Sequence, residues 1–123
     1  MKENEMVKRL SQLRDMQREV DELSQRIGRL EMESRGRVAA PGLERARSLM
    51  EERRWACMEE LGRLYEFIDG IPDSRLRRIF SFRYIDGLTW LQVAFKIGEH
   101  DEQYPRRLHN KYVREQALGG NSF

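Results

Sequence analysis

The sequence predicts an all-α protein, in which a long N-terminal helical hairpin or coiled coil precedes a three-helix unit with the spacing of a helix-turn-helix. Apolar residues recur at three- and four-residue intervals through residues 6–32 and again through 43–68, which is the period of amphipathic helices. Cap residues, glycines and prolines then divide the remainder into three shorter helices. The sequence therefore predicts two regions, 1–70 and 71–123.

The first helix is expected over residues 6–32 and carries a heptad repeat. Its a positions are Met6, Leu13, Val20 and Ile27, and its d positions are Arg9, Met16, Leu23 and Leu30. Only Arg9 interrupts this apolar seam. β-Branched residues at a with Leu at d favour a two-stranded parallel coiled coil, so we expect a homodimer formed through the N-terminal helices.

A loop is expected at residues 34–42, where Gly36, Pro41 and Gly42 interrupt the helical pattern. The second long helix follows over residues 43–68. Its apolar stripe comprises Leu43, Ala46, Met50, Cys57, Leu61, Leu64 and Ile68. A short loop between two helices of matched length also favours an antiparallel hairpin within one chain. Parallel and antiparallel packing both remain open.

The middle helix of the C-terminal unit is delimited at both ends by local chemistry. Thr89 is an N-cap residue type and Gln92 follows three positions later, which is the spacing of a capping box. Leu88 and Val93 have the spacing of a hydrophobic staple across that cap. Gly98 stands where helices commonly end in a left-handed residue. A short capped helix followed by a tight turn is typical of a helix-turn-helix.

Two further helices flank this one. The preceding helix is expected over residues 74–84. The last helix begins between Asp101 and Tyr104, because Pro105 is tolerated only in the first turn of a helix. Helical periodicity is lost past Arg114, so a short disordered tail is expected at the C-terminus.

The last helix is basic and is the candidate DNA-binding element. Arg and Asn side chains read guanine and adenine edges in a major groove, and Lys and Arg bind phosphate. The candidate base-reading residues are Arg106, Arg107 and Asn110, and the candidate backbone contacts are Lys111, Arg114, Thr89 and Gln92. His109 is expected at the surface or on the DNA backbone. Arg75, Arg77 and Arg78 are expected to bind phosphate, and two of them could equally pair with acidic residues of the N-terminal hairpin.

Residues 76–94 read Leu-Arg-Arg-Ile-Phe-Ser-Phe-Arg-Tyr-Ile-Asp-Gly-Leu-Thr-Trp-Leu-Gln-Val-Ala and resemble region 4 of bacterial sigma factors. The version with Arg83-Tyr84 and Thr89-Trp90 around a glycine turn is similar to small sigma-region-4-like regulators of Gram-positive phages and prophages, of the RinA and ArpU type. The resemblance implies a transcriptional regulator of phage genes, with double-stranded DNA and RNA polymerase as partners.

An alternative is an adaptor that binds RNA polymerase or another sigma-like partner without touching DNA. The acidic pair Asp101 and Glu102 at the start of the last helix favours this alternative, because acidic side chains repel phosphate. Both functions are compatible with a helix-turn-helix shape.

Composition limits the other classes of function. The chain of 123 residues has a formal net charge of +2, yet residues 75–114 hold nine Lys or Arg against four Asp or Glu. With two His, one Cys and no Gly-rich phosphate loop, we expect no enzyme, no cofactor and no metal site. Cys57 is expected in the core. No signal peptide or apolar run of membrane length occurs, so we expect a cytoplasmic protein without a membrane partner.

Overall fold

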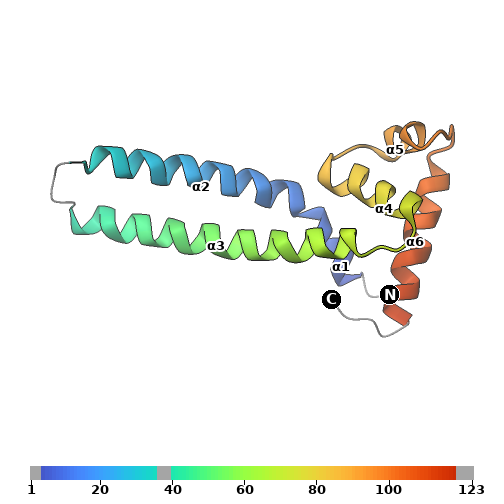
Figure 1. The fold of residues 1–123 in the computed structure, drawn as a ribbon, viewed down its shortest axis with the longest axis horizontal. Coiled ribbons are helices and arrows are strands. Elements are labelled where there is room, and N and C mark those ends of the chain that lie inside the picture. Colours follow the sequence, from blue (N-terminus) through green and yellow to red (C-terminus); the bar gives the residue numbers. More distant parts are fainter. Residues whose placement is uncertain (1–3, 36–39, 119–123) are drawn as a thin grey trace. The chain divides into compact units, whose positions relative to one another are not determined.

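The computed structural model describes residues 4–35 and 40–118, which form helices joined by short loops (Figure 1). The elements are α1 (Glu5–Ser11), α2 (Leu13–Glu33), α3 (Pro41–Asp69), α4 (Ser74–Phe80), a π-helical turn η1 (Ser81–Ile85), α5 (Trp90–Lys96) and α6 (Gln103–Leu118). The described ranges contain no β-strand, so the predicted all-α class is confirmed.

The chain forms two compact units. Residues 4–14 and 63–118 belong to one, and residues 15–35 and 40–62 belong to the other. This grouping differs from the sequence-based boundary at residue 70. The physical reason is that Phe67, near the end of α3, packs its ring 6.1 Å from Phe80 of α4 and 6.3 Å from Tyr112 of α6. The last turns of α3 therefore share a core with the C-terminal helices.

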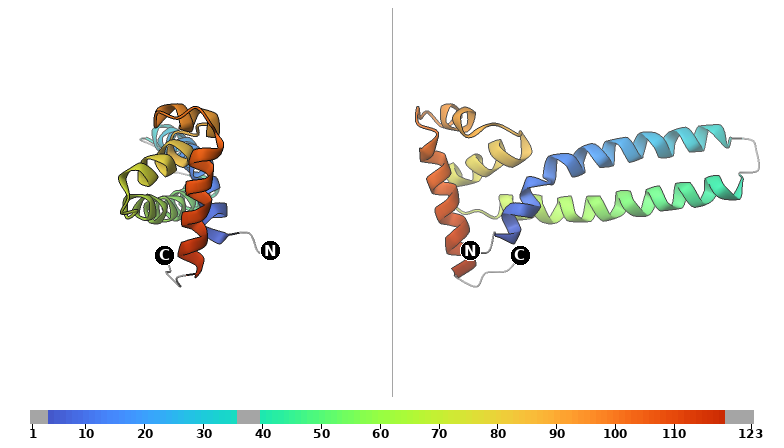
Figure 2. Two further views of the ribbon diagram at one scale, coloured as in Figure 1. Left: turned by 90° about the vertical axis from the view of Figure 1, so that its right-hand side faces the viewer. Right: turned by 180° about the vertical axis from the view of Figure 1, so that it is seen from behind.

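Within the unit of residues 15–35 and 40–62, α2 and α3 lie side by side (Figures 1 and 2). Three contacts join them: Cys57 Sγ to Glu19 Oε1 at 3.6 Å, Arg54 to Ser24 Oγ at 3.2 Å, and Arg47 to Glu31 at 3.7 Å. From the first contact to the third, the residue number rises along α2 and falls along α3. The two helices therefore run antiparallel here. A parallel homodimer concerns a second copy of the chain and stays a prediction.

Cys57 is buried, as expected from its place on the apolar stripe. Burial and the nearby Glu19 carboxylate raise the pKa of its thiol. The stripe is not buried over its whole length, however, because Leu43 near the start of α3 is exposed. The buried part of α3 begins at Cys57 and continues through Ile68.

The predicted single helix over residues 6–32 is wrong, because the helical ladder is interrupted at Gln12. The Gln12 N–H donates to the Arg9 carbonyl at 3.1 Å, which ends α1, and α2 begins at the next residue. Leu10 is buried to 1% exposure, whereas Arg9, the d position of the heptad, is only half-buried. Leu10 is therefore the buried residue of this turn, whereas a continuous heptad would bury Arg9 at its d position.

The second long helix begins two residues earlier than expected, at Pro41. Proline suits the first helical position, because the N–H it lacks would have no partner within the helix there. Residues 36–39 of the predicted loop lie outside the described residues. At the other end of the chain, α6 continues to Leu118, so residues 115–118 are helical rather than part of a disordered tail. Residues 119–123 are not described.

The helix predicted over residues 74–84 changes geometry at Ser81. The Asp73 carboxylate accepts from the Leu76 N–H at 2.8 Å and caps α4. At the other end, the Asp86 N–H donates to the Ser81 carbonyl five residues back, at 3.1 Å, which is the hydrogen bond of a π-helix. The helix therefore ends in a wider, π-helical turn before the loop that leads to α5.

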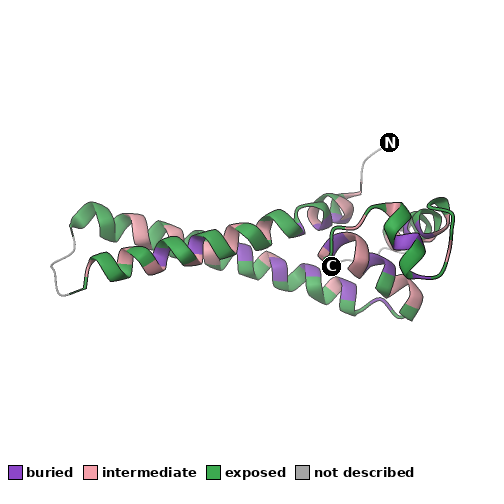
Figure 3. Ribbon diagram, turned by 90° about the horizontal axis from the view of Figure 1, so that it is seen from above, coloured by how far each residue is buried: buried purple, intermediate pink, exposed green. Residues whose placement is uncertain are grey.

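Residues coloured as buried occur on the C-terminal helices (Figure 3), and α4, α5 and α6 bury a common apolar cluster. Ile79 from α4 and Val93 and Ile97 from the α5 segment are buried at its centre. Leu76, Phe82, Leu88, Trp90, Tyr104 and Leu108 pack around them. Leu88 and Val93 belong to the same cluster, in agreement with the predicted staple. The cluster fixes α5 and α6 on α4.

Candidate nucleic-acid interface

The solvent face of α6 carries the basic residues that the sequence singles out. Arg106, Arg107, Asn110, Lys111 and Arg114 are all exposed. Pro105 and His109 are buried on the opposite side of the same helix. Helical spacing places Arg107, Lys111 and Arg114 in one row and Arg106 with Asn110 in the adjoining row.

The four cations of this face have no competing partner within the described part of the chain. No hydrogen bond or ion pair joins Arg106, Arg107, Lys111 or Arg114 to another described residue. We call the side chains of Arg106, Arg107, Asn110, Lys111 and Arg114 the α6 face. Free cations on one face of a helix attract phosphate without first breaking an internal ion pair.

Thr89 and Gln92 lie at the start of α5, and they form the predicted capping box. The Thr89 hydroxyl accepts from the Gln92 N–H at 3.2 Å, and the Gln92 side-chain carbonyl accepts from the Thr89 N–H at 2.9 Å. Both residues are exposed. The box uses their acceptor atoms, so the Thr89 O–H and the Gln92 amide N–H groups remain as donors. Donors of this kind suit phosphate oxygens.

The turn between α5 and α6 is held by local polar contacts. Gly98 has φ +82°, a left-handed value that glycine adopts without strain. The Asp101 carboxylate accepts from the Gln103 N–H at 2.9 Å and so caps the start of α6. The Glu99 carboxylate pairs with Arg75 at 2.9 Å. Two of the acidic residues before α6 thus have structural roles.

The arginines of α4 donate to backbone carbonyls, and their expected contacts with phosphate or with acidic residues of the N-terminal helices stay predictions. Arg75 donates to Ile97 O at 3.2 Å, Arg77 to Ile71 O at 2.7 Å, and Arg78 to Lys96 O at 3.4 Å. Lys96 and Ile97 lie at the C-terminal end of α5, where carbonyls lack partners within their own helix, and Arg78 and Arg75 supply the missing donors. Ile71 O lies in the loop before α4. Leu88 O lies in the loop before α5, and Arg83 donates to it at 3.0 Å. These arginines stabilise turns, whereas the cations of the α6 face have no such partner in the described part of the chain.

His109 is buried, so its expected place at the surface or on the DNA backbone is wrong. Only 4% of its surface is exposed. Its ring stacks on Phe80 with centroids 4.7 Å apart, and Trp90 meets it edge-on at 5.1 Å. The sequence held a signal for this, because Pro105, His109 and Tyr112 share one side of a helix at i, i+4 and i+7.

Two side-chain hydrogen bonds link His109 to its neighbours. The Tyr84 hydroxyl lies 2.6 Å from His109 Nε2, and His109 Nδ1 lies 2.9 Å from Asn110 Oδ1. Burial is the main cause that lowers the pKa of His109, and the charges of Arg83 and Arg106 lower it further. Burial raises the pKa of Tyr84 to about 12. Both groups are therefore neutral near pH 7.

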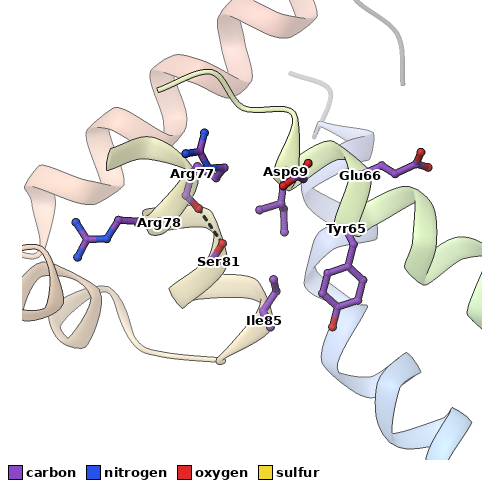
Figure 4. A pocket seen from close by; sticks show the side chains of 8 residues that line it. Tyr65, Glu66, Asp69, Arg77, Arg78, Ser81 and Ile85 are labelled. Carbon is purple, nitrogen blue, oxygen red and sulfur yellow. Dashed lines mark hydrogen bonds between the residues drawn. The ribbon is translucent and has the colours of Figure 1, made fainter. Parts of the chain in front are cut away.

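A separate open groove lies between the end of α3 and α4 with η1 (Figure 4). Its volume is about 550 Å³. It is lined by Tyr65, Glu66, Ile68, Asp69, Arg77, Arg78, Ser81 and Ile85. None of the seven predicted DNA-contacting residues lines it. The acidic side chains come from α3 and the basic ones from α4, so the groove has no single charge.

No protein-family model, curated protein or solved structure matches the chain. Within residues 4–35 and 40–118, no group of three or more His, Cys, Asp or Glu side chains is placed to hold a metal ion. None of the described helices combines the length and apolar character needed to cross a membrane.

Proposed function

We propose that this protein is a sequence-specific DNA-binding regulator of transcription, and that α6 enters the major groove of double-stranded DNA. The observation that carries the proposal is the α6 face, which gathers on a single helix one amide and four cations that have no partner among residues 4–35 and 40–118. An α-helix fits the width of the major groove. Packing of α5 and α4 against the opposite side of α6 gives the helix a rigid support.

The side chains of the α6 face divide into two roles. Arg106, Arg107 and Asn110 lie nearer the start of the helix and would read base edges, because recognition helices contact bases mainly through their N-terminal residues. Lys111 and Arg114 would hold phosphates, together with the free donors of Thr89 and Gln92 at the start of α5. Phosphate contacts fix the position of the helix, and base contacts select the sequence.

The resemblance of residues 76–94 to sigma factor region 4 supports the biological setting. We propose that the regulated genes belong to a phage or prophage and that RNA polymerase is a further partner in the cytoplasm. Homodimerisation through the N-terminal helices would present two α6 helices to the DNA. Two half-sites about one helical turn of DNA apart, or a multiple of that distance, would then be expected.

A second candidate function is an adaptor that binds a protein partner. Exposed Trp55 and Met58 on α3, with 66% and 48% of their surfaces accessible, favour this alternative, because large aromatic and Met side chains are enriched in protein interfaces. The sequence-based argument from Asp101 is weaker than it was, because the Asp101 carboxylate caps α6 and so has a structural role. The adaptor could share the fold without using the α6 face.

Binding of the purified chain to a fluorescent random duplex distinguishes the two candidates. A DNA-binding protein should bind at low salt and lose affinity steeply as salt is added, because binding releases counterions from phosphate. An adaptor should not bind at any salt concentration. The control variant is Arg45→Gln, which removes one exposed arginine of α3 outside the α6 face and should bind like the unmodified chain.

A further inference from the structure

Asn110, the one uncharged residue of the α6 face, is held by a buried neighbour. Its Oδ1 lies 2.9 Å from His109 Nδ1. His109 is in turn bonded through Nε2 to the Tyr84 hydroxyl at 2.6 Å. A chain of two hydrogen bonds thus runs from the aromatic core to the exposed amide.

The proton positions in this chain follow from its chemistry. An amide oxygen can only accept, so His109 Nδ1 must carry the hydrogen that it donates to Asn110 Oδ1. A neutral imidazole has a single N–H, so Nε2 must accept, and the Tyr84 O–H donates to it. The aromatic cage of Phe80 and Trp90 holds the imidazole ring in place. The structure therefore selects one tautomer of His109.

That tautomer determines what Asn110 offers to a ligand. A bidentate contact with adenine needs the amide oxygen to accept from N6–H while the amide nitrogen donates to N7. One of the two lone pairs of the oxygen accepts from His109, and this bond holds the oxygen toward the buried ring and fixes the plane of the amide. The amide nitrogen keeps both of its N–H donors for DNA, and these match acceptors such as guanine N7 and O6 or thymine O4.

We propose that Tyr84 and His109 are positioning residues that make Asn110 select hydrogen-bond acceptors and discriminate against adenine. The inference rests on the proposed DNA-binding function and deepens it, because it names the class of base edge that this position reads. Asn110 itself touches the base, whereas Tyr84 and His109 act only through it.

The proton arrangement is tested without DNA. Nitrogen NMR of the free protein, labelled with ¹⁵N at histidine, reports the tautomers of His109 and of His100, the only two histidines in the chain. His109 should be a single Nδ1–H tautomer, and exposed His100 should average between the two. An Nε2–H tautomer at His109 would overturn the inference.

The specificity role is tested by selecting bound duplexes from a random pool. The unmodified chain should disfavour adenine at one base pair by about fivefold to 100-fold, the range that a good base contact provides. Tyr84→Phe should reduce this discrimination by about fivefold or more, because His109 can then take the other tautomer and release Asn110. Selection of adenine by the unmodified chain, or unchanged preference in Tyr84→Phe, would contradict the proposal.

A double-mutant cycle removes effects of Tyr84→Phe on folding. Asn110→Ala should abolish preference at that base pair, and adding Tyr84→Phe in the same chain should change nothing further. A further change at that base pair would show that Tyr84 acts on specificity by another route and would overturn its positioning role. If no sequence is selected at all, the DNA-binding function fails and the specificity role with it. The His109 tautomer is measured in the free protein and does not depend on DNA binding. It therefore shows whether the hydrogen-bond chain from Tyr84 to Asn110 is correct even if the protein does not bind DNA.

Discussion

The Arg75 guanidinium lies 2.9 Å from the Glu99 carboxylate and 3.2 Å from the Ile97 carbonyl. It also stands over the Tyr104 ring, with 5.2 Å from its central carbon to the ring centroid. One side chain of α4 therefore contacts the end of α5, the turn and the first turn of α6. These contacts fix where α6 begins relative to the helices that support it.

We predict that Arg75→Ala destabilises the protein more than Glu99→Gln does. The ion pair is about 40% exposed at both side chains, so solvent screens it and its loss alone should cost about 0–1 kcal/mol. Arg75→Ala also removes the Ile97 hydrogen bond and the contact with Tyr104, so its cost should be about 1–3 kcal/mol. Urea denaturation measures both values. Equal effects would mean that the ion pair is the whole contribution of Arg75.

A second prediction concerns Gly87, in the loop between η1 and α5. Gly87 has φ +71°, and a Cβ there would lie 2.5 Å from Arg14 Nε. Arg14 is held against this loop by its hydrogen bond to Ile85 O at 3.2 Å. Gly87→Ala should destabilise the protein by about 1 kcal/mol or more, because it adds backbone strain to a close contact.

Gly28 supplies the matched control for Gly87. It lies inside α2, and a Cβ there would meet nothing within 4 Å. Gly28→Ala should therefore stabilise the protein by about 0.5–1 kcal/mol through helix propensity. Opposite signs for the two glycine-to-alanine changes in thermal melts are the expected result. Destabilisation by Gly28→Ala would instead indicate a contact made in the assembled protein, such as a coiled-coil partner.

The burial of His109 predicts a pH dependence of stability. Its pKa in the folded protein is lowered from the ordinary value of 6.5, so below about pH 6.5 the unfolded chain binds more protons than the folded one. The stabilising contribution of neutral His109 is fully present above pH 6.5. It is lost as pH falls from there through the lowered pKa.

His109→Phe isolates this contribution, since it keeps an aromatic ring against Phe80. The free energy of unfolding of the original chain should fall more between about pH 7.5 and pH 5.5 than that of His109→Phe. Urea titrations at both pH values give the comparison. An identical pH dependence in both proteins would show that His109 is not protonated less readily in the folded state.

Single substitutions on the α6 face should separate base reading from phosphate binding. Arg107→Ala should weaken binding to the selected sequence by about 1–3 kcal/mol and relax preference at one base pair. Lys111→Ala should weaken binding to selected and scrambled duplexes alike. Gel shifts with both duplexes test the difference. Equal losses on the two duplexes for Arg107→Ala would assign it to the backbone instead.

Features set by a few neighbouring residues could be predicted from the sequence. The Thr89–Gln92 capping box and the left-handed Gly98 depend on chemistry within one helix and its ends, and both are present. The exposure of the α6 face also follows from helical periodicity. These predictions needed no knowledge of which helix packs on which.

Features that depend on contacts between distant residues could not be predicted. The carbonyl partner of Arg75 is 22 residues away in the chain, and the hydroxyl partner of His109 is 25 residues away. The heptad repeat likewise did not show that the ladder breaks at Gln12, because Leu10 competes with Arg9 for the same buried place. For His109, residue type allowed a contact with the DNA backbone, and tertiary packing buried the ring instead.

The salt dependence of DNA binding tests the central claim about the α6 face most directly. The logarithm of the binding constant should fall linearly with the logarithm of salt concentration, by about 0.9 for each phosphate neutralised. Lys111→Gln and Arg114→Gln should each reduce this slope by about 1, while Arg45→Gln leaves it unchanged. A slope that is the same in all four proteins, or no binding to DNA at low salt, would contradict the account.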